Sequence, residues 1–244
     1  MDLFTSIDIY CERTDASFWS EPINAVTNLA FLISALWAFW TYRTLLLGDR
    51  KQGHDWLILI ALVMAGLIGI GSFLFHTYAT IWASYADVIP IWSFVAFYLF
   101  LALYRIVGLS LWRTLRIYAI ALCVTAGALW LVSTALLASD GVEAGSDGFN
   151  GSTQYLPGMI ALYGFAVALF IRHHAARGWI LSAAVTFSVS IFFRTIDLNV
   201  CVGFPLGTHF LWHCLNGLFI GFLLQALVRY GRKPQSGLNA ETNR

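Results

Sequence analysis

The sequence predicts an all-α membrane protein, a bundle of seven transmembrane helices with its N-terminus outside and its C-terminus in the cytoplasm. Of the 244 residues, 59% are hydrophobic and only 11% are charged, whereas soluble globular domains average about 45–50% and about 25%. A hydrocarbon core about 30 Å thick requires about 20 apolar residues per helical crossing, and the chain has room for seven such crossings. A net charge of +1, without any block of like charges, excludes a nucleic-acid-binding surface.

Seven apolar runs define the expected helices in order. The first run follows an acidic leader and is too long for the apolar core of a signal peptide, which has about 7–15 residues, so we expect it to stay attached. We therefore expect a leader over residues 1–23, a transmembrane domain over 24–230 and a disordered polar tail over 231–244. The runs are Asn24–Leu46, Trp56–Phe75, Asp87–Val107, Leu115–Leu137, Tyr155–Ile171, Trp179–Phe193 and Thr208–Val228.

The basic residues predict the orientation. With seven crossings, 12 of the 14 Lys and Arg residues lie at one end of the bundle and only Arg13 and Arg194 lie at the other. Because Lys and Arg favour cytoplasmic loops, the first end is predicted to face the cytoplasm. The leader and the loops after the second, fourth and sixth helices are then predicted to face outward.

Ionisable groups inside a membrane cost several kcal/mol and mark functional sites, and here they gather at the outer end. His76 closes the second run, with Ser72 one helical turn before it, and Asp87 is expected to open the third run. His209 and His213 open the last run at positions i and i+4. These five side chains are predicted to converge without any break in a helix.

Three imidazoles with an open fourth position are typical of catalytic zinc, which lowers the pKa of water and polarises a carbonyl. In such a site Asp87 would orient or deprotonate the water, and Ser72 would stabilise the developing oxyanion. Haem is disfavoured because its two axial histidines come from opposite faces of the ring. A proton relay in a transporter is the other alternative, although no acid or base lies at mid-helix depth.

The leader concentrates four carboxylates, of Asp8, Glu12, Asp15 and Glu21, with only Arg13 to offset them. Calcium takes about 6–8 oxygen ligands and suits such an irregular segment, but a solvated acidic leader explains the composition equally well. Cysteines 11 and 201 both fall in outer segments, where an oxidising compartment permits a disulfide. Near the outer end of the sixth run, we interpret residues Arg194 and Asp197, at i and i+3, as an ion pair.

Three segments resemble the alkaline ceramidase family of integral membrane amide hydrolases. They are residues 21–28 (Glu-Pro-Ile-Asn-Ala-Val-Thr-Asn), residues 71–76 (Gly-Ser-Phe-Leu-Phe-His) together with Asp87, and residues 209–213 (His-Phe-Leu-Trp-His). The resemblance extends over nearly the whole chain. It implies a seven-helix bundle in which His76, His209 and His213 bind zinc beside Ser72 and Asp87.

The same resemblance implies a calcium site formed by Glu12, Glu21 and an aspartate, here Asp8, and a disulfide between Cys11 and Cys201. The leader departs from the animal pattern. The Asp precedes the Cys by three residues rather than two, Tyr10 replaces Trp, Thr14 replaces Asn, and the stretch to Glu21 is shorter. Thr14 or Asp15 is a possible substitute for a lost calcium ligand. These variants look like bacterial members of the family and favour a bacterial inner membrane.

The resemblance thus implies a zinc-dependent hydrolase that cleaves the N-acyl bond of ceramide-like membrane lipids to a fatty acid and a sphingoid base. A membrane lipid is the expected partner, and no obligate protein partner is indicated. Two alternatives stay open: a lipid-sensing protein of the adiponectin-receptor and haemolysin-III type, and a proton-coupled transporter. The acyl length, the base and the natural lipid are not determined by the sequence.

Overall fold

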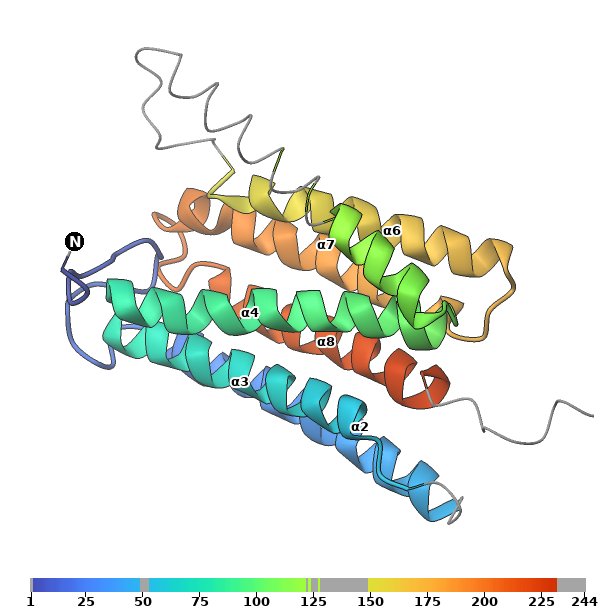
Figure 1. Ribbon diagram of the computed structural model, residues 1–244. Coiled ribbons are helices and arrows are strands. Elements are labelled where there is room, and N and C mark those ends of the chain that lie inside the picture. The colour runs from blue at the N-terminus through green and yellow to red at the C-terminus, as the bar shows by residue number, and fades with distance from the viewer. Residues whose placement is uncertain (1, 49–52, 122, 124–126, 128–148, 232–244) are drawn as a thin grey trace, which may run out of the picture.

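The computed structural model describes residues 2–48, 53–121, 123, 127 and 149–231, and this part of the chain is helical without any β-strand (Figure 1). A short π-helical segment, Ala102–Ile106, follows the helix Ile81–Leu101, and a short 3-10 segment, Ser152–Tyr155, precedes the helix Leu156–Ile171. The elements are α1 (Pro22–Thr27), α2 (Leu29–Gly48), α3 (Trp56–Tyr78), α4 (Ile81–Leu101), η1 (Ala102–Ile106), η2 (Ser152–Tyr155), α6 (Leu156–Ile171), α7 (Arg177–Val200) and α8 (His209–Tyr230).

Within the described residues, six helical segments are long and apolar enough to cross a membrane, which indicates a multi-pass membrane protein. Of the expected fourth crossing, Leu115–Leu137, only residues 115–121, 123 and 127 belong to the described part, where they are helical. The other residues of that run, and residues 232–244 of the expected tail, lie outside it. The count of seven crossings and the orientation of the termini therefore remain predictions.

Helix α8 lies at the centre of the bundle. It packs extensively on α7 and α2, while α3 packs on α4 and α2, and α6 packs on α7. Small residues allow α2 and α8 to approach closely: a Cβ on Gly217 would lie 2.6 Å from the Cβ of Ala30. Such contacts are typical of membrane bundles, where van der Waals packing replaces the hydrophobic effect between helices. The core therefore fixes α8, and with it two of the predicted histidines, relative to the other helices.

The expected start of the third crossing at Asp87 is wrong, because α4 begins at Ile81. Only two residues separate α3 from α4, and Ala79 closes α3 in the left-handed conformation (φ 44°). The leader completes this turn: the N–H groups of Ile81 and Trp82 donate to the carbonyls of Thr5 (3.2 Å) and Leu3 (3.0 Å). Asp87 consequently lies six residues after the start of α4, about 1.7 turns deeper in the bundle than expected.

Candidate metal centre

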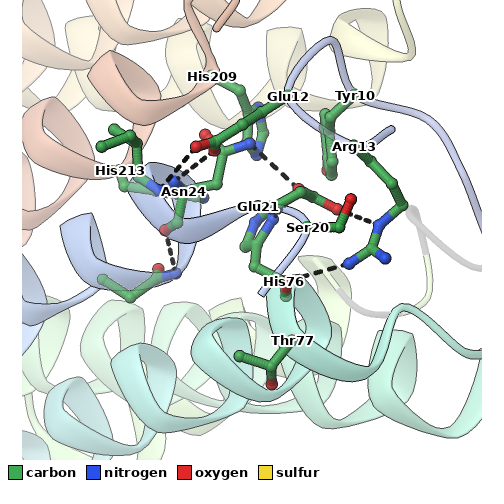
Figure 2. A network of polar contacts seen from close by, with 12 residues as sticks. Tyr10, Glu12, Arg13, Ser20, Glu21, Asn24, His76, Thr77, His209 and His213 are labelled. Atoms are coloured by element: carbon green, nitrogen blue, oxygen red, sulfur yellow. Dashed lines mark hydrogen bonds and ion pairs between the residues drawn. The ribbon is translucent and has the colours of Figure 1, made fainter. Parts of the chain in front are cut away.

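Three buried imidazoles meet at the leader end of the bundle (Figure 2). One ligand atom from each of His76, His209 and His213 lies within 4.8 Å of the others, and each residue is at most 2% exposed. His76 comes from the last turn of α3, and the other two come from the first two turns of α8. The structure therefore brings together the three histidines that the sequence singles out.

The leader fixes the orientation of the His76 ring. Its Nδ1 lies 2.6 Å from Oε2 of Glu21, while its Nε2 is buried and has no hydrogen-bond partner. Histidines that bind metals usually donate their second ring N–H to a carboxylate, which fixes the tautomer. An Nδ1–H donor to Glu21 leaves the Nε2 lone pair free for a metal ion.

The hydroxyl group of Thr27 orients the His213 ring, again through a contact with Nδ1. Thr27 Oγ1 lies 3.1 Å from Nδ1 of His213, and also 2.8 Å and 3.0 Å from the carbonyls of Ile23 and Asn24. Because carbonyls only accept, the single hydroxyl proton of Thr27 is directed to one of them. With the hydroxyl proton on a carbonyl, the His213 Nδ1–H donates to Thr27, and its Nε2 carries the free lone pair.

The His209 ring is held by stacking. It lies on Tyr10, with the ring centroids 3.7 Å apart and the planes at 25°, and its Nδ1 is buried without a hydrogen-bond partner. A cluster of imidazoles with buried, unpaired nitrogens is costly unless a ligand completes it. The donor set fits zinc, for which three histidines are a common ligand set.

Asp197 positions the start of α8. Its fully buried carboxylate accepts hydrogen bonds from the backbone N–H groups of Thr208 (2.6 Å), His209 (2.9 Å) and Cys11 (3.4 Å). The first N–H groups of a helix have no partner within the helix and attract negative charge. One carboxylate of α7 thus joins the α8 N-terminus to the leader.

The expected ion pair between Arg194 and Asp197 is therefore wrong. The Arg194 guanidinium instead lies over the rings of Tyr155 (5.5 Å) and Trp212 (5.3 Å) and donates to the hydroxyl of Tyr10 at 3.5 Å. Although positions i and i+3 share a helix face, the Asp197 carboxylate is taken by the unpaired N–H groups of α8.

Ser72 and Asp87 lie beside the histidines because α3 and α4 approach closely. A Cβ on Gly71 would overlap the carbonyl oxygen of Ala86 and would lie 3.4 Å from the Cα of Asp87. Pro90 lacks the N–H that would bond the Ala86 carbonyl within α4. The Asp87 carboxyl interacts with the Ser72 side chain, and its Oδ1 is buried without a hydrogen-bond partner.

The two buried carboxylates of the leader, those of Glu12 and Glu21, already accept hydrogen bonds. Glu12 accepts from the N–H groups of Ile23 and Asn24, both at 2.7 Å. Glu21 accepts from Arg13 Nε (2.5 Å) on one oxygen, and from His76 Nδ1 and Asn24 Nδ2 (3.1 Å) on the other. All four carboxylate oxygens are thus used.

The other expected calcium ligands do not join these two acids. Asp8, Thr14 and Asp15 are exposed, and the Asp15 carboxylate accepts instead from the N–H of Ser17 at 2.8 Å. Because calcium requires about 6–8 oxygen ligands, and the buried cation beside Glu21 is a guanidinium, the leader in this conformation does not fit a calcium ion.

The surroundings of the two buried leader acids shift their pKa values in opposite directions. Burial raises the pKa of Glu12, and the N–H groups of Asn24 and Ile23 offset only part of this effect. Burial also raises the pKa of Glu21, but hydrogen bonds and charge from His76, with hydrogen bonds from Asn24 and Arg13, outweigh it and hold the pKa below its usual value. The surroundings of Glu21 therefore favour its ionised form more than those of Glu12 do.

A disulfide ties the leader to the segment that precedes α8. The Sγ atoms of Cys11 and Cys201 lie at bonding distance, with their Cα atoms 5.3 Å apart and a sequence separation of 190. This is the pairing that the resemblance implies. It holds the leader beside the histidine cluster, where Tyr10 stacks on His209.

Comparison of the chain with protein-family models and with curated protein sequences gives no match. The three histidines and the disulfide are thus seen in the fold of this chain, while the family suggested by its motifs remains an expectation.

Sequence reasoning missed four residues of the site. Arg13, Tyr10 and Thr27 contact the histidines or Glu21 directly, and Asp197 holds the backbone of His209. A signal existed for only one of them, since Arg13 is a lone basic residue in an acidic leader. The positions of the others depend on contacts between distant segments.

Proposed function

We propose that the protein is a zinc-dependent hydrolase of lipid amides, embedded in a bacterial inner membrane with the leader end outside. The observation that carries the proposal is the buried cluster of His76, His209 and His213, with ligand atoms within 4.8 Å of one another. Its support also includes the acid and hydroxyl beside the cluster and the motifs that resemble alkaline ceramidases. The substrate class we propose is a ceramide-like N-acyl lipid.

In this proposal the three histidines bind the metal, and other residues transfer protons. His76 and His213 would offer Nε2, and His209 would offer one of its ring nitrogens, to a zinc ion. Zinc in such a site supplies a Lewis acid that polarises an amide carbonyl and lowers the pKa of water.

Proton transfer is assigned to Asp87. Its Oδ1 is buried and unpaired, so it accepts the proton of the attacking water and passes it to the leaving amine. The Ser72 hydroxyl donates to the oxygen that becomes negative as the amide is attacked. The apolar chains of the lipid lie among the helices, and Tyr10 covers the cluster from the leader side.

The test combines metal analysis with product detection. The purified protein is assayed for zinc, and a panel of N-acyl lipids is incubated with it and examined by mass spectrometry for released fatty acid and amine. We expect one zinc per chain and amide cleavage in the wild type, and loss of both in His76→Ala and His213→Ala. Exposed His54, just before the other end of α3, provides the control variant His54→Ala, which should keep both.

Two results would reject this function. Undiminished hydrolysis in both histidine variants would remove the catalytic role of the cluster. Movement of intact lipid across liposomes, with no cleavage of any panel member, would favour a transporter instead.

A further inference from the structure

The buried guanidinium of Arg13 lies at the junction of the leader and the metal centre (Figure 2). Its Nε donates to Glu21 Oε1 at 2.5 Å, its Nη1 to the carbonyl of Asp15 at 3.0 Å and its Nη2 to the carbonyl of His76 at 3.1 Å. The side chains of Arg13 and Glu21 are only 2% and 3% exposed. One cation thus contacts the acid, the leader backbone and the backbone of a histidine of the centre.

These contacts form a continuous chain to the metal-facing nitrogen. Glu21 uses one oxygen for Arg13 and the other for Nδ1 of His76, whose Nε2 is left for the metal. A carboxylate behind a ligating histidine fixes the ring and raises its basicity. The guanidinium fixes the carboxylate in turn, because its planar donors hold the acid and two carbonyls at once.

The balance of buried charges also indicates that Arg13 is the partner that stabilises ionised Glu21. A buried carboxylate is costly unless a cation compensates it, and Arg13 is the cation paired with Glu21 among the described residues. The His76 carbonyl lies in the last turn of α3, where carbonyls lack helical partners and favour positive charge. A second cation of charge +2 in the same place would be repelled by Arg13.

We propose that Arg13 is a positioning residue of the metal centre, and that its guanidinium replaces a bound calcium ion as the cation of the leader. It holds Glu21 against His76 and makes zinc binding independent of calcium. The proposal rests on the metal-binding part of the proposed function and not on the substrate.

The experiment measures the zinc dissociation constant by competition with a chromophoric chelator, on the full-length protein in detergent, with and without added calcium chloride. Wild-type affinity should be the same in both solutions. Arg13→Gln removes the charge and should weaken zinc binding by about 10–100-fold. Arg13→Lys keeps the charge but loses the planar fork, so its affinity should lie between the two.

A matched control separates positioning from general stability. Arg105 forms a partly buried ion pair with Asp55 at the other end of the bundle, at 3.5 Å. Arg105→Gln should lower the melting temperature and leave the zinc affinity unchanged, whereas Arg13→Gln should lower both.

The outcomes distinguish the two proposals. Zinc binding in Arg13→Gln as tight as in the wild type, or wild-type zinc affinity that rises with calcium, would overturn the role of Arg13 alone. A wild type that binds no zinc would overturn both proposals. If Arg13→Gln does not fold, unchanged zinc affinity in Arg13→Lys still rejects the positioning role.

Discussion

Replacement of Gly71 by alanine tests whether the close approach of α3 and α4 positions Asp87. The new Cβ would overlap the Ala86 carbonyl oxygen and would lie 2.8 Å from the carbonyl carbon, whereas carbon atoms in contact are normally about 3.5–4.0 Å apart. The two backbones must therefore separate by about 1 Å. Gly66→Ala is the control, since nothing lies within 4 Å of a Cβ at that position of α3.

The free energy of unfolding should separate the two variants. Alanine is favoured over glycine in a helix by about 0.8–1.0 kcal/mol, and this gain is common to both. Overpacking costs about 1–3 kcal/mol, so Gly71→Ala should be less stable than Gly66→Ala by about that amount. Thermal unfolding in detergent measures the difference.

The rate of fatty acid release should also distinguish the two variants. A misplacement of 1 Å in a catalytic group costs about 100-fold in rate, so Gly71→Ala should lose about that factor in fatty acid release while Gly66→Ala keeps the wild-type rate. Zinc content should be unchanged, because the three histidines lie on α3 and α8 rather than on α4. Wild-type activity and equal stability of the two variants would refute the reasoning.

Two further predictions concern the supports of the centre. Reduction of the disulfide, or Cys11→Ser, should lower the free energy of unfolding by about 2–4 kcal/mol, and the reductant should have no added effect on Cys11→Ser; a wild type whose thermal unfolding is insensitive to reductant would contradict this. Thr27→Val keeps the shape of the side chain but removes the acceptor of the His213 Nδ1–H, so it should weaken zinc binding by about 10–100-fold. Chelator competition measures this loss, and an unchanged dissociation constant would show that Thr27 does not orient the ring.

Much of the scaffold follows from local properties of the sequence. The length of an apolar run can be read along the chain, so the runs around α2, α3, α6 and α8 predict helices close to those observed, whereas α7 continues to Val200, past the predicted end at Phe193. The spacing of His209 and His213 places them on one face of a helix whatever surrounds it. The predicted start of α4 at Asp87 is wrong because Ile81 and Trp82 form hydrogen bonds with the leader backbone. No local sequence pattern indicates that contact.

The sequence by itself therefore determined the helical membrane scaffold and the end at which its polar residues gather. Only the tertiary structure decided how each histidine is oriented, because the partners lie far apart in the chain: 55 residues separate Glu21 from His76, and 186 separate Thr27 from His213. The same holds for Arg13, whose guanidinium reaches Glu21 and the carbonyl of His76 only in the folded chain. A hydrogen bond depends on distance and direction between two atoms, and folding alone brings such distant atoms together.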